Sequence, residues 1–388
     1  MVATRANWSF PTAIRFGVGR IAELPEVCRN LGMRRPLLVT DPALAKLPMV
    51  GETLARCAAA GLRVGCFSEI RANPVGTDVQ RGLAIYSSGT HDGVIAFGGG
   101  SALDVGKVIA FMSGQKRPLW DFEDREDWWT RADAAGIAPV IAVPTTAGTG
   151  SEVGRAGVIL DEEASIKKII FHPKMLPSVV IMDPELTVGL PASITAATGM
   201  DALSHCIEAY CAPTFHPMAE GVALQGMRLI HDSLSRVVTD GKDVEARGAM
   251  LAAAAMGATA FQKGLGGMHA LAHPIGAVCN THHGLTNAVL MPYVLAFNRS
   301  AIEKSIGRAA AYLGLGQPNF EGFQEWILGL REKIGIPHGL DQLNVTGAQV
   351  EKLAAMAEAD PSAAGNPILF DAAAARSVLE NALAGRLE

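Results

Sequence analysis

Four of the ten histidines in this 388-residue chain lie close together in one glycine-containing segment. They are His269, His273, His282 and His283, within residues 266–284, where most other side chains are apolar or are glycines. A buried imidazole needs a hydrogen-bond partner, so clustering four of them in apolar surroundings is costly for a plain core. Imidazole is also a common protein ligand of transition metals. The segment therefore indicates a metal site, and a purely structural role for all four rings is the less favoured interpretation.

A second, upstream element supplies an acid and a fifth imidazole. In Gly199-Met-Asp-Ala-Leu-Ser-His205 the aspartate and the histidine are four residues apart, so on a helix they share one face. Asp201 or His205 alone could equally be a cap or a satisfied polar group. Three imidazoles and one carboxylate suit Fe²⁺ or Zn²⁺ better than Mg²⁺ or Ca²⁺, which prefer oxygen ligands.

The elements that must position these residues follow from the hydrophobic pattern. Over residues 1–188 short apolar runs alternate with helical patterns, which predicts an α/β domain with a mostly parallel sheet. Residues 189–388 are rich in alanine and leucine with helical periodicity, which predicts an all-α domain that carries the metal site. The predicted strands are 36–40, 62–67, 93–97 and 138–143, and the predicted helices are 50–60, 78–88, 102–112, 196–211, 218–238, 243–262, 301–313 and 322–334.

Two loops that follow predicted strands have the composition of a phosphate or ribose site. Gly98-Gly-Gly-Ser-Ala-Leu-Asp-Val-Gly-Lys107 leads into a helix, whose first N–H groups attract phosphate, and its glycines let a ligand approach the backbone. Pro144-Thr-Thr-Ala-Gly-Thr-Gly-Ser-Glu152 offers hydroxyl donors. A bare glycine turn and a cluster of Ser/Thr turns are the alternative interpretations. Two such loops at strand ends favour the nucleotide crevice of a Rossmann-like sheet.

Asp41 directly follows the first clear strand. Its carboxylate could bond a ribose 2′-hydroxyl and would repel a 2′-phosphate, which predicts NAD rather than NADP. An N-cap for the following turn is an equally good interpretation from the sequence.

The bulk composition limits the choice of partners and compartment. The net charge of −5 provides no basic field to attract nucleic acid or an anionic membrane. The first residues lack the apolar region of a secretory signal, and no apolar run reaches the roughly 18 residues of a membrane span. The six cysteines form no CxxC pair. We therefore expect a cytoplasmic protein with a small-molecule substrate, without a nucleic-acid or membrane partner. Residues 121–135 are predicted to form a surface loop or irregular insertion.

The motifs occur together in the order of one known family. The two glycine loops, Asp183-Pro-Glu, Gly199-Met-Asp-Ala-Leu-x-His205, and Gly267-x-His-x-x-x-His-Pro-x-Gly276 with His283-Gly284 resemble the iron-containing (group III) alcohol dehydrogenases nearly end to end. The resemblance implies a nucleotide-binding domain, a helical metal-binding domain and a cleft between them. It also implies hydride transfer between NAD and a primary alcohol or its aldehyde, with the substrate oxygen bound to Fe²⁺ or Zn²⁺, in a homodimer or larger homo-oligomer.

The resemblance also assigns site residues. It implies that the metal ligands are Asp201, His205, His269 and His283, and that His273 handles a proton near the nicotinamide. His282 stands where relatives commonly have proline, so its role stays open. The cofactor positions implied by the resemblance are Asp41, Asn73, Gly98, Gly99, Gly100, Ser101, Asp104, Thr145, Thr146, Thr149 and Lys167.

Three other functions would share part of this pattern. A maleylacetate reductase shares the fold, but some members lack the full ligand set that is present here. A zinc lyase of the dehydroquinate synthase type would need a basic cluster around residues 201–283, which the sequence lacks. A metal- or nucleotide-sensing protein on the same scaffold would keep the motifs without catalysis.

Overall fold

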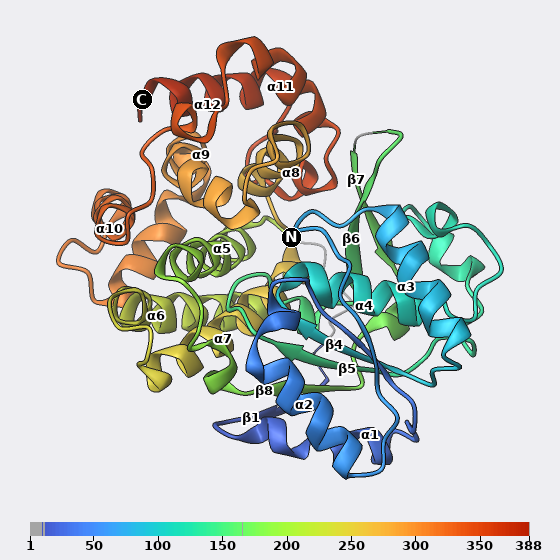
Figure 1. Ribbon diagram of the computed structural model, residues 1–388. Coiled ribbons are helices and arrows are strands. Elements are labelled where there is room, and N and C mark those ends of the chain that lie inside the picture. The colour runs from blue at the N-terminus through green and yellow to red at the C-terminus, as the bar shows by residue number, and fades with distance from the viewer. Residues whose placement is uncertain (1–9, 11, 165, 388) are drawn as a thin grey trace. The chain divides into compact units, whose positions relative to one another are not determined.

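The computed structural model describes residues 10, 12–164 and 166–387 (Figure 1). The chain divides into two compact units. The α/β unit comprises Phe10–Thr146 and Gly150–Val188, and the helical unit comprises Ala147–Thr149 and Gly189–Glu388. The predicted fold class, a parallel sheet with helices followed by an all-helical region, is confirmed.

Six parallel strands form the sheet of the α/β unit, in the order β1-β8-β5-β4-β2-β3. Every residue of β4 and β5 is buried, which explains why both strands show as continuous apolar runs in the sequence. The four predicted strands correspond to β2, β3, β4 and β5, whereas β1 and β8 were not predicted. The bounds are β1 (Ala13–Phe16), β2 (Leu37–Val39), β3 (Gly65–Phe67), β4 (Val94–Gly98), β5 (Val140–Pro144) and β8 (Val179–Met182).

Helices pack on the sheet and direct the nucleotide loops. Ile95 and Phe97 of β4 belong to one apolar cluster with residues of α1 and α2, and α4 packs against β2, β4 and β5. The helix α4 begins at Gly100, immediately after β4 ends, so its first turn lies at the carboxyl end of the strands. The bounds are α1 (Leu24–Asn30), α2 (Pro48–Ala59), α3 (Gly76–Ser88) and α4 (Gly100–Met112).

A second, two-stranded sheet completes the α/β unit and was not predicted. It is the antiparallel hairpin of β6 (Ala156–Asp161) and β7 (Ile166–Phe171), and β6 packs against α4. Residues 121–135 consist of turns and short 3₁₀ segments, as predicted. There Arg131 lies over the Trp128 ring, 4.0 Å from its centroid.

The helical unit is built around α5, in which all residues from Thr195 to Tyr210 are buried. Such a helix, covered on all sides, is typical of a core position, and α6, α7 and α9 pack against it (Figure 1). The predicted helix 301–313 is only the second half of α9, and α8 was not predicted. The bounds are α5 (Ala192–Cys211), α6 (Pro217–Thr239), α7 (Val244–Ala260), α8 (Gly267–Cys279), α9 (His283–Leu313), α10 (Phe320–Lys333), α11 (Val350–Glu358) and α12 (Ala372–Ala384).

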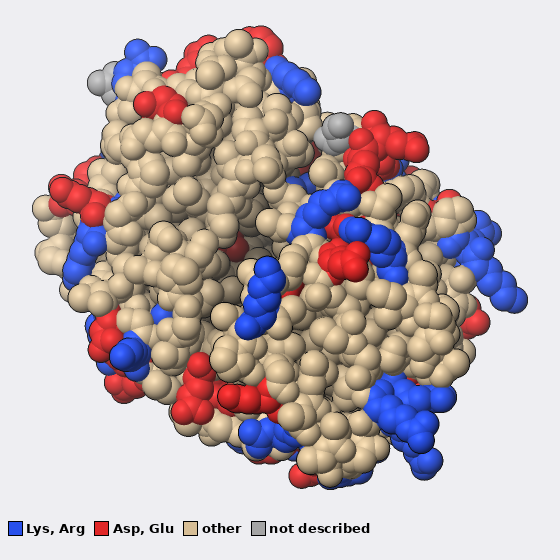
Figure 2. All heavy atoms as spheres, viewed as in Figure 1, with Lys and Arg blue, Asp and Glu red and all other residues tan. Residues whose placement is uncertain are grey.

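The surface carries both signs of charge. On the face drawn in Figure 2, basic and acidic side chains are interspersed among neutral ones. Among the helices of the described residues, none has the length and apolar character needed to cross a membrane. All six cysteines are free thiols.

Candidate metal centre and nucleotide site

The metal centre starts from two side chains on the central helix α5. Asp201 and His205 lie one turn apart and are both buried. His269, the third residue of α8, joins them, and one potential ligand atom from each of the three lies within 4.8 Å of the others. The rings of His205 and His269 stack with their centroids 4.7 Å apart. Three buried donors thus converge from two helices, as a metal site requires.

His283 adds a fourth donor from the first residue of α9. Its Nε2 atom lies 3.6 Å from Oδ1 of Asp201. The approach depends on Gly284, because a Cβ atom there would lie 2.5 Å from the Ala197 carbonyl oxygen and 2.9 Å from Cβ of Asp201. Only glycine lets the start of α9 pack this closely on α5.

The side chain of Asn287 shows that these donors point to one place. Its Nδ2 atom lies 2.9 Å from Oδ1 of Asp201, 3.3 Å from Nε2 of His269 and 3.2 Å from Nε2 of His283. The amide nitrogen donates to Asp201, and the Nε2 atoms of both histidines face the same nitrogen. Three potential ligand atoms thus lie around one point, and the chemistry of three imidazoles and one carboxylate fits Fe²⁺ or Zn²⁺.

Burial and a neighbouring carboxylate shift the pKa values of two expected ligand histidines in opposite directions. Burial lowers the pKa of His205 to about 4, so this ring is neutral at physiological pH and can coordinate. For His269 burial also lowers the pKa, but the adjacent Glu208 carboxylate raises it more, and the resulting pKa lies above the usual value. Nδ1 of His269 lies 2.5 Å from Oε2 of Glu208.

His273 occupies a different position from the expected ligands. Its ring stacks on that of His283, with centroids 5.4 Å apart, and its Nδ1 atom lies 2.8 Å from Oδ2 of Asp360. Burial raises the pKa of Asp360, but the contact with His273 outweighs it, and the pKa falls below the usual value. A carboxylate at Nδ1 directs the other ring nitrogen, Nε2, away from it.

His282 caps the helix that carries His283. Its Nδ1 atom accepts a hydrogen bond of 3.3 Å from the Leu285 N–H, and it is the N-cap residue of α9. The residue that departs from the resembling family thus has a local structural role.

In the α/β unit, the glycine loop lies at the carboxyl ends of adjacent strands. Gly98 ends β4 with φ of +148°, a conformation that favours glycine, and Gly99 is the N-cap of α4. A Cβ atom on Gly99 would lie 3.2 Å from the Thr146 side chain, so the loops after β4 and β5 face each other. The hydroxyl of Ser101 donates to the Ala72 carbonyl at 2.6 Å, which ties the loop to the residue before Asn73. The expected crevice residues of β4 and β5 are thus brought together.

Asp41 caps the following turn, which is one of the two roles that the sequence left open, and its bond to a ribose hydroxyl stays a prediction. Its Oδ1 atom accepts hydrogen bonds of 2.9 Å from the N–H groups of Ala43 and Leu44, so it caps the following turn. Its Oδ2 atom faces Gly98, 3.8 Å from where a Cβ atom there would stand. One oxygen therefore holds the turn, and the other lies beside the glycine loop.

Asp104 and Lys167 have structural surroundings that the sequence did not indicate. Asp104 accepts hydrogen bonds from the Ser151 hydroxyl and from the Val158 N–H, and it contacts Lys107. Its carboxylate thus holds the loop after β5 and the hairpin against α4.

Lys167 pairs with Leu160 across the hairpin, and the Leu160 N–H donates to the Pro74 carbonyl, next to Asn73. The hairpin thereby joins the loop that carries Asn73. Thr145 and Thr146 belong to the α/β unit, whereas Thr149 belongs to the helical unit.

Comparison with known proteins connects both halves of the chain to one family. A family model described as iron-containing alcohol dehydrogenase matches residues 11–184, and the model of the C-terminal part of the same family matches residues 195–383. The chain belongs to the iron-containing alcohol dehydrogenase family. The expected family membership and enzyme class are thereby confirmed.

The relatives of this iron-containing alcohol dehydrogenase family member cover almost all of its length. A 4-hydroxybutyrate dehydrogenase of Cupriavidus necator is 39% identical over 383 residues, which is 96% of this chain and 98% of the relative. An NAD-dependent methanol dehydrogenase of Bacillus methanolicus is 34% identical over 384 residues, 97% and 100% of the two chains. The crystal structure of a 1,3-propanediol oxidoreductase has a TM-score of 0.93 at 35% identity and covers 97% of this chain and 99% of that chain. The family is thus one of NAD-linked, iron-containing oxidoreductases that act on alcohols.

Three polar residues next to the expected site of this family member were not found by the sequence analysis. Glu208 follows His205 by three residues and Asn287 follows His283 by four, so helical spacing could have indicated both. Asp360 is 87 residues from His273, and no local pattern connects the two.

Proposed function

We propose that this chain is an NAD-dependent, metal-containing alcohol dehydrogenase that interconverts a primary alcohol and its aldehyde. The observation that carries the proposal is the convergence of Asp201, His269 and His283 on one amide nitrogen, with His205 stacked against His269. Family membership supports the same reaction class.

In this proposal Asp201, His205, His269 and His283 would hold Fe²⁺ or Zn²⁺. The bound metal would supply a Lewis acid for the substrate oxygen, and NAD would supply the hydride acceptor. The four side chains come from three helices, α5, α8 and α9, and α9 packs against both of the others. Asp201, His205 and His269 are buried, which restricts access of water and strengthens electrostatic interactions in the site.

His273 is the proposed proton carrier. The Asp360 carboxylate accepts at Nδ1, which leaves the lone pair on Nε2 to take the hydroxyl proton of an alcohol. In the reverse direction the same nitrogen returns the proton to the oxygen of the aldehyde. Because the His273 ring stacks on the His283 ring, it lies beside the proposed metal ligands.

The proposed cofactor residues lie mainly in the α/β unit. The Gly98–Ser101 loop and the first turn of α4 would bind the pyrophosphate, and Thr145 and Thr146 would donate to phosphate or ribose oxygens. Oδ2 of Asp41 would accept from the ribose 2′-hydroxyl, which supports NAD over NADP. Asn73, Asp104, Thr149 and Lys167 complete the proposed set.

We also propose the finer points of substrate, assembly and compartment. The named activities of the relatives make 4-hydroxybutyrate and 1,3-propanediol the first alcohols to test. Six free thiols agree with a cytoplasmic protein. We propose a homodimer or larger homo-oligomer that has no nucleic-acid or membrane partner. Size-exclusion chromatography with light scattering would measure the mass of the assembly.

The experiment combines metal loading with a substrate panel. Protein purified anaerobically and loaded with Fe²⁺ or Zn²⁺ is mixed with NADH and a series of aldehydes, and the near-ultraviolet absorbance of the cofactor is followed. Metal-dependent oxidation of NADH by an aldehyde is the expected result. If the metal-loaded protein binds NADH but turns over no aldehyde with NADH and no alcohol with NAD⁺, the proposal is wrong and a sensing role is favoured.

A further inference from the structure

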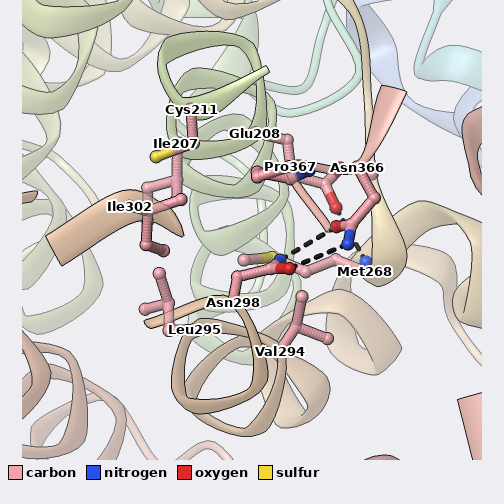
Figure 3. Close-up of a pocket in the computed structure, with 11 residues that line it drawn as sticks. Ile207, Glu208, Cys211, Met268, Val294, Leu295, Asn298, Ile302, Asn366 and Pro367 are labelled. Atoms are coloured by element: carbon pink, nitrogen blue, oxygen red, sulfur yellow. Dashed lines mark hydrogen bonds between the residues drawn. The ribbon is translucent and has the colours of Figure 1, made fainter. Parts of the chain in front are cut away.

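The start of α8 is held by side chains from distant parts of the chain. Its N-cap residue, Gly266, has no side chain to bond the free N–H groups of the first turn. The Gly267 N–H donates to Oδ1 of Asn366 at 3.0 Å. The Met268 N–H donates to Oε1 of Glu208 at 2.7 Å (Figure 3). The next residue is His269. The two caps therefore fix the backbone on which this imidazole stands.

Glu208 also bonds the His269 side chain itself. While Oε1 accepts from the Met268 N–H, Oε2 lies 2.5 Å from Nδ1 of His269, and both side chains are almost fully buried. A carboxylate only accepts, so Nδ1 carries the proton and donates. The lone pair of the neutral ring then lies on Nε2, the atom that faces Nδ2 of Asn287 together with Asp201 and His283.

The Asn366 cap is itself part of a closed network. Its Nδ2 atom donates to Oδ1 of Asn298 and to the Ile368 carbonyl, both at 2.8 Å. Its Oδ1 atom accepts from Nδ2 of Asn298 at 2.9 Å as well as from Gly267. These asparagines and Glu208 line one small pocket (Figure 3). Because Asn298 lies on α9 and Glu208 on α5, the network joins the three helices that carry the proposed ligands.

We propose that Glu208 is a positioning residue of the metal centre: it caps α8 and holds His269 in the Nδ1–H tautomer, so that Nε2 is presented to the metal. This inference rests on the proposed role of His269 as a ligand. A carboxylate behind a ligand histidine typically changes metal affinity by 10- to 100-fold.

Glu208→Gln tests both contacts at once. A glutamine has one acceptor oxygen for two donors, the Met268 N–H and Nδ1–H of His269, and its amide would oppose one of them. Glu220→Gln is the matched control, because it removes a carboxylate from an ion pair with Lys263 in the same unit, at 3.0 Å. Glu208→Asp keeps two acceptor oxygens on a shorter side chain and should fall between wild type and Glu208→Gln.

Two readouts are needed, and both are taken on folded full-length protein checked by circular dichroism. Competition with a chromophoric chelator measures the Kd for Zn²⁺, and ¹⁵N NMR of histidine-labelled, chelator-treated protein identifies which nitrogen of His269 is protonated. The His269 signals are assigned by their loss in His269→Asn. For Glu208→Gln we expect a Kd raised about 10- to 100-fold and a loss of the Nδ1–H population. Glu220→Gln should change neither.

The outcomes separate this inference from the proposed function. If wild-type protein binds no Zn²⁺, the metal site itself is wrong. If wild type binds Zn²⁺ and Glu208→Gln binds it equally well, the positioning role is overturned. It is also overturned if affinity falls while Nδ1 stays protonated, since a general loss of packing would then explain the effect. If Glu208→Gln does not fold, Glu208→Asp decides by the same two readouts.

Discussion

Nε2 of His283, in the first turn of α9, lies 3.6 Å from Oδ1 of Asp201, in the middle of α5. The contact exists because α9 begins directly on the surface of α5, where Gly284 has no Cβ atom to hold the two helices apart. The position of one proposed ligand thus depends on the packing of a neighbouring glycine as well as on its own side chain. We therefore expect packing and metal binding in this unit to be coupled.

Gly284→Ala tests this coupling. The added Cβ atom would meet the Ala197 carbonyl oxygen and Cβ of Asp201, so we expect a loss of about 1–3 kcal/mol of stability and weaker Zn²⁺ binding. The measurements are the thermal midpoint and the Kd from chelator competition. The control is Gly329→Ala on α10, where no atom lies within 4 Å of the new Cβ atom and the change should be neutral or slightly stabilising. Equal behaviour of the two variants would contradict the close approach.

Asp41→Asn distinguishes the role of Asp41 as a cap from its proposed role in binding the ribose. Asparagine keeps an acceptor for the N–H groups of Ala43 and Leu44 but loses the charge beside Gly98. We expect the fold to be retained, NAD affinity to fall about tenfold, or about 1.4 kcal/mol, and discrimination against NADP to weaken. Fluorescence titration with NADH and NADPH measures both, with Glu26→Gln on α1 as the charge control. An unchanged ratio of the two affinities would leave Asp41 as a cap alone.

The stability of the α/β unit should depend on the ionisation of Glu152. Burial raises the pKa of this carboxyl to about 7, from an ordinary value of 4.5. Between these two values the folded protein holds a proton that the unfolded chain has lost, so this residue's contribution to stability decreases as pH rises through the window. Glu152→Gln cannot ionise. Relative to wild type it should therefore gain on the order of 1–3 kcal/mol more at pH 8 than at pH 5.

Thermal midpoints at the two pH values measure this difference. Glu163→Gln, at an exposed position in the β6–β7 turn, is the control and should show the same offset from wild type at both. A pH-independent difference for Glu152→Gln would show that the carboxyl titrates normally.

His273→Ala should separate proton handling from metal binding. Because His273 is bonded to Asp360 and is not one of the proposed ligands, its removal should leave the metal content unchanged. The loss of a general acid–base typically lowers kcat by about 10²- to 10⁴-fold. Steady-state turnover on an active aldehyde, measured with equal metal content, tests this. A variant with normal kcat would remove His273 from the proposed mechanism.

Most of the correct predictions of the fold came from local sequence motifs. The buried strands β4 and β5 are continuous apolar runs, and the glycine loop directly follows β4. Hydrophobic pattern and composition were therefore sufficient to predict these strands and the loop. The edge strand β1 has only four residues and none is buried, so it leaves no such run. The hairpin of β6 and β7 is held by contacts with α4 and with Pro74 that no local pattern encodes.

The helical unit shows the same limit. Pro292 lies inside α9 and Pro274 inside α8, and proline usually interrupts a helix. Only the second half of α9 was predicted, and α8 was not predicted. Asn287 was missed for that reason, since its spacing from His283 has meaning only once α9 begins at residue 283. The contact of Asp360 with His273 spans 87 residues and required the fold itself.

The most direct test of the ligand assignment is the metal content of three variants prepared anaerobically and compared with wild type by mass spectrometry of the metals. Wild type and His273→Ala should each contain about one Fe²⁺ or Zn²⁺ per chain, whereas His269→Ala and His283→Ala should retain little and should not turn over. Full metal content in His269→Ala or His283→Ala, or loss of metal from His273→Ala, would contradict the division of the histidine segment into ligands and proton carrier.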